Sequence, residues 1–503
     1  MTSTLEHVDV LIVGAGLSGI GAAHHLQRAF PRRTYTILEA RDAIGGTWDL
    51  FRYPGIRSDS DMFTLGYRFR PWLGDKAIAD GGSILTYVRE TAAEGGIDRH
   101  IRFGHRVRRA DWSSAEQRWT VTAQRADTGE TVTLTANFLF CCSGYYRYDQ
   151  GYTPQFRGTD RFGGTIVHPQ HWPEDLEVDG KRVVIIGSGA TAVTLGPALT
   201  QLGAQVRMLQ RSPSYVLSLP ARDDFADRMR KLLPAKAAYA LTRAKNVAYS
   251  TAIYQLSQRY PERMRAWIRG LQQRWLPEGY DIDTHFTPSY DPWDQRLCLV
   301  PNGDLFRAIR KGRLEMVTDR IDTFTETGLR LASGTELDAD IVVTATGLDL
   351  LIFGGVEMTV DGAAVDLPKA MAYKAMMLSD VPNFAYIIGY TNASWTLKAD
   401  LVCEYVVRLL RYLDSHGYAS ATPVRDPSVG TAPFMAGFTP GYVLRAAGRL
   451  PAAGDRRPWR LHMNYLRDIP AFRYGRIADG TLTFARPPRA DRVLSREARA
   501  EGA

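Results

Sequence analysis

Cysteine is scarce in this chain of 503 residues, and its four cysteines fit no metal-binding or redox pattern. Cys141, Cys142, Cys298 and Cys403 form no CxxC pair and no cluster with histidine. The sequence therefore favours neither a metal site nor a dithiol redox centre. So few thiols are typical of a reducing compartment, and we expect a cytoplasmic protein.

Long apolar runs are also lacking, since no stretch approaches the roughly 18 residues that a membrane-spanning helix needs. The first strand pattern begins near Val8, which leaves no room before it for a signal peptide. Internal repeats and low-complexity tracts are absent as well. The composition, 45% hydrophobic and 23% charged, is typical of a globular enzyme, and the length predicts two or three domains.

The net charge of +8 is concentrated in one segment. Residues 221–280 hold twelve Lys and Arg against five Asp and Glu, a net charge of +7. Aromatic and aliphatic residues recur there at largely helical spacing, so we expect a helical insert over about 221–290. A solvated insert is the favoured interpretation, and contact with an anionic membrane surface is the alternative. Nucleic-acid binding is less favoured, because no reader motif accompanies the charge.

The N-terminal region carries a complete dinucleotide-binding pattern. An apolar strand at 7–13 runs into Gly14, Gly16 and Gly19, a helix start follows, and the next strand ends in Glu39. The glycines allow a tight turn, close approach of a pyrophosphate and helix packing, while the helix N-terminus stabilises the phosphates. Glu39 would accept hydrogen bonds from ribose hydroxyls and repel a 2′-phosphate. This first cleft therefore suits FAD or NAD.

The pattern recurs with a different charge. Another apolar strand runs into Gly187, Gly189 and Ala192, and the strand after it ends in Arg211 and Ser212. Alanine is tolerated at the third glycine position. A guanidinium and a hydroxyl in place of the acid would hold a 2′-phosphate through charge-assisted hydrogen bonds, which predicts NADPH. A chain with both clefts moves hydride from nicotinamide to flavin, and the lack of a cysteine pair leaves quinones or oxygen as the electron acceptor.

Two longer patterns carry a resemblance to a known family. The FxGxxxHxxxWP pattern is matched by Phe162, Gly164, His168, Trp172 and Pro173, and residues 45–59 match GGxWxxxxYPGxxxD. The chain therefore resembles the class B flavoprotein monooxygenases of the Baeyer–Villiger family. Within that family it is most similar to the branch of the ethionamide-activating monooxygenase. The resemblance extends to about Arg486 and is carried further by residues 51–61, 292–304 and 390–400.

The predicted fold is α/β, with two Rossmann-like dinucleotide-binding domains, for FAD and NADPH, and a helical insert. We expect a discontinuous FAD domain, 1–150 and 345–503, around an NADPH domain at 151–344. The insert is expected to cap the cleft between the two domains. His168 is expected to hold the domains in register, and residues 344–347 should form the return crossing.

The resemblance implies an activity and two catalytic residues. NADPH would reduce FAD, and a C4a-peroxyflavin would insert one oxygen atom of O2 into ketones, giving esters or lactones, or oxygenate the sulfur of thioethers or thioamides. Arg296 resembles the family's active-site arginine, which would stabilise the developing negative charge, and Asp59 resembles the acid that orients it. Gln295 stands where the family often has lysine, which places more of the NADPH preference on Arg211 and Ser212.

Three alternatives remain open. These are a flavin-containing or N-hydroxylating monooxygenase, an uncoupled NADPH oxidase, and a non-catalytic nucleotide sensor. Trp172 favours Baeyer–Villiger chemistry over the first, because the related flavin-containing monooxygenases place another aromatic residue there. Residues 392–398, with Trp395, are a candidate lining of the substrate cavity, and core packing is equally consistent with them.

The candidate cofactor contacts follow from these patterns. Those for FAD are Gly14, Gly16, Ser18, Gly19, Glu39, Gly46, Thr47, Trp48, Asp59 and Val107. Those for NADPH are Arg57, Ser58, Gly187, Ser188, Gly189, Ala190, Thr191, Ala192, Arg211 and Ser212.

Overall fold

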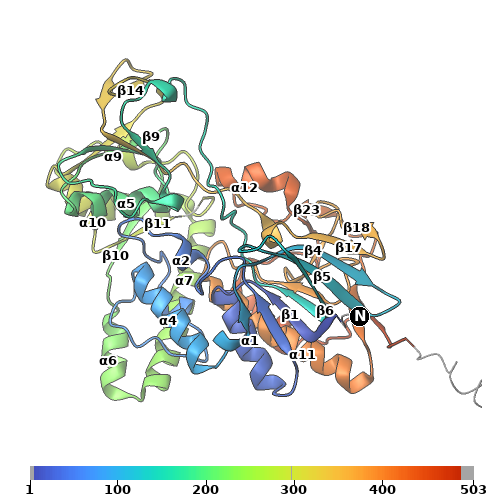
Figure 1. The fold of residues 1–503 in the computed structure, drawn as a ribbon. Coiled ribbons are helices and arrows are strands. Elements are labelled where there is room, and N and C mark those ends of the chain that lie inside the picture. Colours follow the sequence, from blue (N-terminus) through green and yellow to red (C-terminus); the bar gives the residue numbers. More distant parts are fainter. Residues whose placement is uncertain (1–4, 296, 489–503) are drawn as a thin grey trace, which may run out of the picture.

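A computed structural model describes residues 5–295 and 297–488, so the predicted catalytic Arg296 lies outside the described residues. Figure 1 shows two sheets with their helices: a five-stranded sheet at the upper left and a larger one at the lower right. The expected α/β class with two Rossmann-like units and helical content is confirmed. No helix among the described residues is long and apolar enough to cross a membrane.

The larger sheet has nine strands in the described part of the chain, in the order β18-β17-β4-β5-β6-β1-β2-β3, with β21 beside β6. Its parallel strands are β1 Glu6–Val13, β2 Tyr35–Leu38, β3 Ile101–Arg102, β6 Thr131–Cys141 and β21 Phe384–Tyr386. Its other strands are β4 His105–Ser113, β5 Arg118–Arg125, β17 Glu357–Val360 and β18 Ala363–Ala364, where β17 pairs with β4 in parallel and the remaining pairs are antiparallel. The run of apolar residues in β1 suits a strand that helices and strands cover on both faces. Helices α1 Leu17–Ala29, α4 Gly81–Glu94 and α11 Trp395–His416 share one hydrophobic cluster with it.

The second sheet is parallel throughout, in the order β12-β9-β8-β16-β7. Its strands are β7 Thr165–Val167, β8 Arg182–Ile186, β9 Gln205–Gln210, β12 Leu314–Thr318 and β16 Ile341–Thr344. Helices α5 Ala190–Gln201 and α10 Asp304–Arg310 pack beside it. Strands of the larger sheet thus come from residues 6–141 and 357–386, and those of the second sheet from 165–344. The domain boundaries at 150 and 344 stay a prediction.

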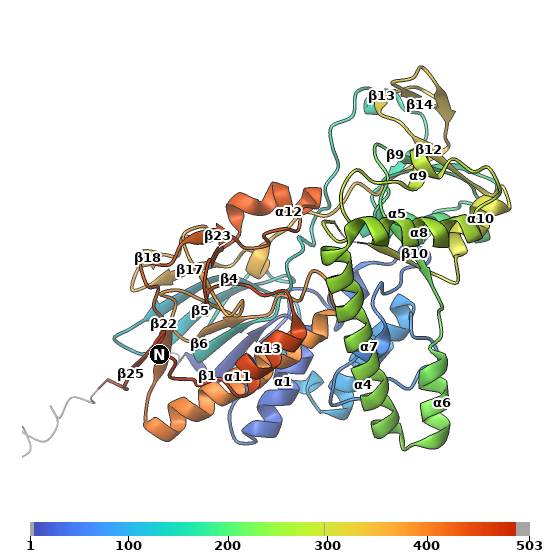
Figure 2. The same ribbon diagram turned by 180° about the vertical axis from the view of Figure 1, so that it is seen from behind.

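The basic segment forms four helices: α6 Asp224–Leu232, α7 Ala235–Arg259, α8 Pro261–Trp275 and α9 Ile282–Phe286. A pair of parallel strands, β10 Val216–Leu219 and β11 Cys298–Pro301, encloses the segment. In Figure 2, α7 runs down the back of the molecule and α8 crosses its upper end. Helix α7 packs on α3 (Met62–Leu65) of the first unit and α8 packs on β10 of the second, so the insert connects the two units.

The remaining elements are short. The helices are α2 Thr47–Leu50, α3 Met62–Leu65, α12 Gly441–Ala446 and α13 Tyr465–Arg473, with 3-10 turns at Asp98–His100, Thr159–Arg161, Pro169–His171, Ile352–Gly355 and Ala447–Arg449. The strands are β13 Ile321–Phe324, β14 Gly328–Leu331, β15 Glu336–Asp338, β19 Ala372–Tyr373, β20 Met377–Leu378, β22 Ser420–Pro423, β23 Thr431–Pro433, β24 Ala452–Gly454 and β25 Leu482–Ala485.

Candidate active site

A single cleft of about 1550 Å³ lies between the two sheets, at the carboxyl ends of β1 and β8. This is where open α/β sheets bind their ligands. Most residues predicted to contact a cofactor line it: Gly14, Gly16, Ser18, Glu39, Gly46, Thr47, Trp48, Arg57, Ser58, Asp59, Val107, Gly187, Ser188, Gly189, Ala190, Thr191, Arg211 and Ser212. Gly19 and Ala192 instead lie behind the turns, at the helix–strand contacts, where the third position of the pattern belongs.

The first glycine turn has one position that the chain itself leaves open. A Cβ on Gly14, whose φ is +102°, would lie 2.8 Å from the Cys142 carbonyl oxygen, and one on Gly19 would lie 1.9 Å from that of Gly14. A Cβ on Gly16 would lie 3.6 Å from the Gly46 Cα, an ordinary contact. Packing therefore requires glycine at 14 and 19 but not at 16. A group that approaches the N-terminus of α1 from outside the chain would require it there.

The second turn repeats this division. A Cβ on Gly187, with φ +137°, would lie 2.3 Å from the Ala345 carbonyl oxygen, whereas one on Gly189 would meet no described atom within 4 Å. Gly16 and Gly189 are the N-caps of α1 and α5, and neither helix receives a side-chain cap among the described residues. Free N–H groups and an open cradle at each helix N-terminus fit a pyrophosphate.

The residues after the second strand of each unit differ in charge, as the sequence predicts. Glu39 is buried, and its two carboxylate oxygens accept the N–H groups of Ala15 at 2.7 Å and Arg41 at 2.9 Å. Burial raises the pKa of Glu39, and those N–H donors oppose the shift. Arg211 and Ser212 are exposed at the rim of the cleft. The first half of the cleft thus presents a carboxylate, and the second half presents a guanidinium.

Arg57 connects the two units beside the cleft. Its Nη1 donates to Oδ2 of Asp304 at 2.5 Å, and both side chains are only 12% exposed. Its Nε and Nη2 are buried without a hydrogen-bond partner among residues 5–295 and 297–488. Two donors of Arg57 are therefore available to a ligand. Asp59 lies two residues further along the same wall of the cleft.

The residues of the FxGxxxHxxxWP pattern lie behind the cleft rather than in its lining. His168 follows β7, and its Nδ1 accepts the N–H of Gln170 at 3.2 Å. Burial lowers the pKa of His168, opposed by the carbonyl of Gly347. A Cβ on Gly151 would lie 2.0 Å from the His168 ring, and the Tyr152 N–H donates to the Gly347 carbonyl at 3.1 Å. His168 thus lies where the two segments that connect the sheets, at Gly151–Tyr152 and at Gly347, run side by side.

The other residues of this pattern are packing residues in the structure. Phe162 packs edge-on against Phe324, and a Cβ on Gly164 would lie 2.4 Å from the Asp340 carbonyl oxygen. Trp172 packs against the hydrophobic cluster around β8 and α5, and the Pro173 carbonyl accepts the N–H of Leu176. The residues of this pattern therefore fix the position of the segment that connects the two sheets.

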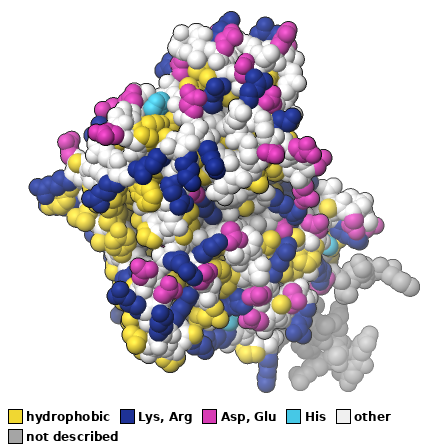
Figure 3. Space-filling view, turned by 90° about the vertical axis from the view of Figure 1, so that its left-hand side faces the viewer, with side chains coloured by type: hydrophobic (Ala, Val, Ile, Leu, Met, Phe, Trp, Pro, Cys, Tyr) yellow, Lys and Arg dark blue, Asp and Glu magenta, His cyan; other side chains and the backbone are white. Residues whose placement is uncertain are grey.

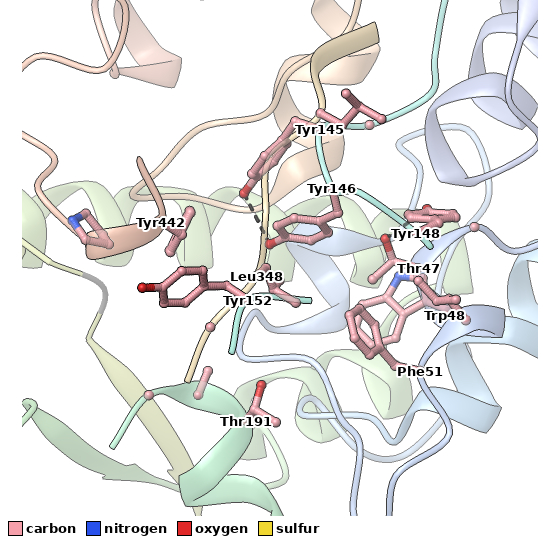
Figure 4. Close-up of a pocket in the computed structure, with 18 of the residues that line it drawn as sticks. Thr47, Trp48, Phe51, Tyr145, Tyr146, Tyr148, Tyr152, Thr191, Leu348 and Tyr442 are labelled. Atoms are coloured by element: carbon pink, nitrogen blue, oxygen red, sulfur yellow. Dashed lines mark hydrogen bonds between the residues drawn. The ribbon is translucent and has the colours of Figure 1, made fainter. Parts of the chain in front are cut away.

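Several tyrosines of the cleft were missed by the sequence analysis (Figure 4). Tyr145 and Tyr146 are joined by their hydroxyls at 3.3 Å, and Tyr145 stacks on Trp395 with ring centroids 5.2 Å apart. Trp395 in turn donates its indole N–H to the Ser18 hydroxyl at 2.8 Å. The available signal was a run of tyrosines directly after β6, at a strand's carboxyl end. The further missed tyrosines of this lining are Tyr148, Tyr152, Tyr290, Tyr390 and Tyr442.

The position of the insert corrects one expectation. Of the residues at 221–290, Tyr290 alone belongs to the described lining of the cleft, so the helices lie beside the cleft and do not cap it. The reason is a buried cation. Arg243 of α7 donates to the carbonyl oxygens of Phe63 and Gly66, both at 2.8 Å, and pairs with Asp400 at 3.4 Å. These contacts hold α7 against the first unit.

Two Rossmann-like units whose glycine turns open into one cleft define the class of the protein: an oxidoreductase fold with two dinucleotide sites. A family model described as flavin-binding monooxygenase-like matches residues 78–392, and one described as an NAD(P)-binding Rossmann-like domain matches residues 12–71. The chain belongs to the flavin-binding monooxygenase-like family. It is a monooxygenase whose cofactors are FAD and NADPH.

Relatives and solved structures agree with this assignment. The FAD-containing monooxygenase EthA of Mycobacterium tuberculosis is 60% identical over 485 residues, which cover 96% of this chain and 99% of that protein. EthA of Mycolicibacterium smegmatis is 56% identical over 483 residues, covering 96% and 98%. An oxidised steroid monooxygenase bound to NADP superposes with a TM-score of 0.74 at 23% identity, covering 95% of this chain and all of that one. The closed form of cyclohexanone monooxygenase gives 0.68 at 20% identity, covering 84% and 87%. At these identities the two structures establish the fold.

Proposed function

We propose that this monooxygenase converts ketones to esters or lactones by Baeyer–Villiger oxidation and also oxygenates the sulfur of thioethers or thioamides. The observation that carries the proposal is the shared cleft, into which both glycine turns open beside a wall of aromatic side chains. Such a site brings a nicotinamide, a flavin and a small organic substrate together and limits the access of water. The FxGxxxHxxxWP pattern, with Trp172, supports the Baeyer–Villiger assignment.

The two halves of the cleft are proposed to hold different cofactors. The turn of Gly14 and Gly16 would hold the pyrophosphate of FAD, with the Glu39 carboxylate on ribose hydroxyls. The turn of Gly187 and Gly189 would hold that of NADPH, with the guanidinium of Arg211 on its 2′-phosphate. When bound, FAD accepts a hydride from NADPH and, once reduced, activates dioxygen.

The residues of this chain would bind, orient and stabilise charge. Arg57 has two free donors at the cleft and a fixed position through Asp304, so it suits a phosphate or carbonyl oxygen of a bound cofactor. Asp59 is proposed to orient Arg296, whose cation would stabilise negative charge that develops on the reacting groups. Tyr145, Tyr146 and Trp395 provide an apolar wall that would exclude water from them.

A substrate screen tests the proposal. The purified holoenzyme would be given NADPH and air with a set of ketones and thioethers, with products identified by mass spectrometry and hydrogen peroxide measured in parallel. We expect esters or lactones and sulfoxides in proportion to the NADPH consumed. Peroxide in proportion to NADPH, without oxygenated product, would identify an uncoupled oxidase. Oxygenation of amines alone would favour the N-hydroxylating alternative.

A further inference from the structure

Helix α7 is fixed in its rotation, so one of its faces always points outward. Its buried residues include Arg243, whose guanidinium donates to the Phe63, Thr64 and Gly66 carbonyls and pairs with the buried Asp400. A buried cation with this many partners cannot leave them without a large cost. The opposite face of α7 is therefore a permanent part of the outer surface (Figure 2).

The fully exposed positions of that outer face carry no charge over about five helical turns. Lys245 is partly exposed among them, and its charge is paired with Asp223. The exposed residues between 237 and 256 are Ala237, Ala240, Leu241, Ala244, Ala248, Tyr249, Ala252, Gln255 and Leu256. Leu241, Tyr249 and Leu256 are 46–54% exposed. The outer face of a helix that is bathed only in water normally carries charged and polar residues. Exposure to water alone therefore does not explain why this face carries apolar residues.

The apolar surface continues onto the neighbouring helices. Leu232 at the end of α6 is 73% exposed, Tyr260 between α7 and α8 is 44% exposed, and Trp267 of α8 is 40% exposed. We call Leu232, Leu241, Tyr249, Leu256, Tyr260 and Trp267 the outer apolar surface. Figure 3 shows hydrophobic side chains gathered along the left-hand edge of the face it presents, with Lys and Arg side chains beside them.

Cations lie at both ends of α7. Lys231 and Lys236 lie near its start, Arg259 and Arg263 near its end, and all four are exposed. The two arginines lie over the Tyr260 ring, at 5.8 and 5.3 Å from its centroid.

These four cations form no ion pair within the described residues. Other cations of the segment do, since Lys245 pairs with Asp223, Arg265 with Asp291 and Arg269 with Asp283. Between residues 228 and 275 the chain has a single carboxylate, Glu262. An excess of positive charge therefore borders the outer apolar surface.

We propose that the outer apolar surface binds an anionic phospholipid bilayer. Leucine, tyrosine and tryptophan side chains would enter the boundary between headgroups and acyl chains, and the four cations would contact lipid phosphates. A second copy of this chain is a poorer occupant, because it would bring another segment of charge +7 against this one. An anionic lipid surface satisfies both the apolar and the cationic parts.

Vesicle sedimentation of the holoenzyme tests the proposal. The probes are vesicles of phosphatidylcholine alone and of phosphatidylcholine with phosphatidylglycerol, at low and at high salt. We expect sedimentation with the anionic vesicles, little with the neutral ones, and a decrease as salt screens the charges. If the holoenzyme stays in the supernatant with anionic vesicles at low salt, the proposal is wrong.

Two variants assign the binding to this surface. Leu241→Glu with Leu256→Glu should abolish sedimentation, and replacing the four cations by Gln should lower affinity about fivefold for each charge removed. Leu202→Glu with Leu444→Glu is the matched control, because both side chains are exposed on other elements, 49% and 59%. Bound flavin and far-UV circular dichroism report folding in every variant. Equal sedimentation of the Leu241/Leu256 variant and the control would overturn the proposal. The proposal would also be wrong if the native chain bound no vesicles but formed a dimer that the Leu241/Leu256 variant dissociates.

Discussion

Arg57 and Asp304 are separated by 247 positions in sequence, yet their side chains form an ion pair at 2.5 Å that joins the two halves of the cleft. Arg57 follows the GGxWxxxxYPG segment of the first unit, and Asp304 begins α10 of the second. Because the pair is nearly buried, it fixes how the two glycine turns face each other. It also leaves two donors of Arg57 for a ligand.

Removing one partner of this pair should destabilise the protein. Asp304→Ala leaves a largely buried guanidinium without its counter-charge, which typically costs about 3 kcal/mol. We expect the Tm of the holoenzyme, followed by release of fluorescent flavin, to fall by several degrees. The control is Asp322→Ala, which breaks the exposed pair with Arg330 and should change Tm little. Equal shifts in both variants would contradict the assigned role.

The glycine turn of the second unit offers a test that separates binding from folding. Gly189→Ala places a methyl group in open space, so we expect normal folding and flavin content, while the methyl group blocks the pyrophosphate. Affinity for NADP+ should fall tenfold or more, about 1.4 kcal/mol, measured by equilibrium titration. Gly187→Ala should instead destabilise the fold, because of its positive φ and the 2.3 Å approach to a carbonyl oxygen. Unchanged NADP+ affinity in Gly189→Ala would show that this glycine turn does not bind the pyrophosphate.

Arg211 should determine which nicotinamide cofactor is used. Arg211→Ala removes a charge-assisted contact to the 2′-phosphate, so KM for NADPH should rise by roughly tenfold or more, with little change for NADH. Arg207→Ala is the matched control, because Arg207 lies on β9, the strand that Arg211 directly follows, and pairs with Glu315 on the surface. Steady-state kinetics with both cofactors provide the measurement. A parallel rise for NADPH and NADH would argue against a phosphate contact.

Arg296 lies outside the described residues, and its role rests on the resemblance. Arg296→Ala should retain reduction of the flavin by NADPH and lose oxygenated product, with hydrogen peroxide released instead, because its cation is needed after hydride transfer. Electrostatic contacts of this kind often contribute about 3 kcal/mol, so product formation should fall by about two orders of magnitude. Anaerobic reduction followed by product analysis separates the two steps, and Arg296→Lys should recover part of the product. Normal oxygenation by Arg296→Ala would refute the role.

His24 should make the stability of the protein depend on pH. It lies on α1, stacks on Phe69 with centroids 3.5 Å apart, and burial, with the charges of His25 and Arg28, lowers its pKa to about 4. The unfolded chain, with a pKa near 6.5, therefore binds more protons between pH 4 and 6.5. Neutral His24 therefore leaves the free energy of unfolding unaffected above that range. As pH falls through the range, the unfolded chain takes up the proton more readily and the free energy of unfolding decreases.

Replacing His24 by an apolar ring should remove this dependence. His24→Phe should gain about 1 kcal/mol relative to the native protein at about pH 5, after allowance for partial solvent exposure, and little at about pH 7.5. Thermal denaturation at both pH values measures the difference, with the exposed His416→Gln as control. A gain that is the same at both pH values would show that packing, and not protonation, is responsible.

The sequence by itself determined the two dinucleotide patterns, the opposite charges after their second strands, and the family. These are local properties. A glycine turn between a buried strand and a helix determines its own conformation, so its residue spacing can be recognised in the sequence. For the same reason the strand at 7–13 was located to within a residue, and the strand expected directly before Gly187 is β8, which ends at Ile186. The family pattern identified the residues around His168 that lie between the two sheets. It did not predict their contacts with Gly151 and Gly347.

Only the tertiary structure decided which distant residues meet. The Arg57–Asp304 pair, the wall formed by Tyr145 and Trp395, and the placement of α7 beside the cleft all depend on contacts between elements far apart in sequence. Hydrophobic periodicity indicates that a helix has a buried face, but not which surface covers that face. The burial of Arg243, which holds α7 in place and turns its largely apolar face outward, followed from partners that no local pattern predicts.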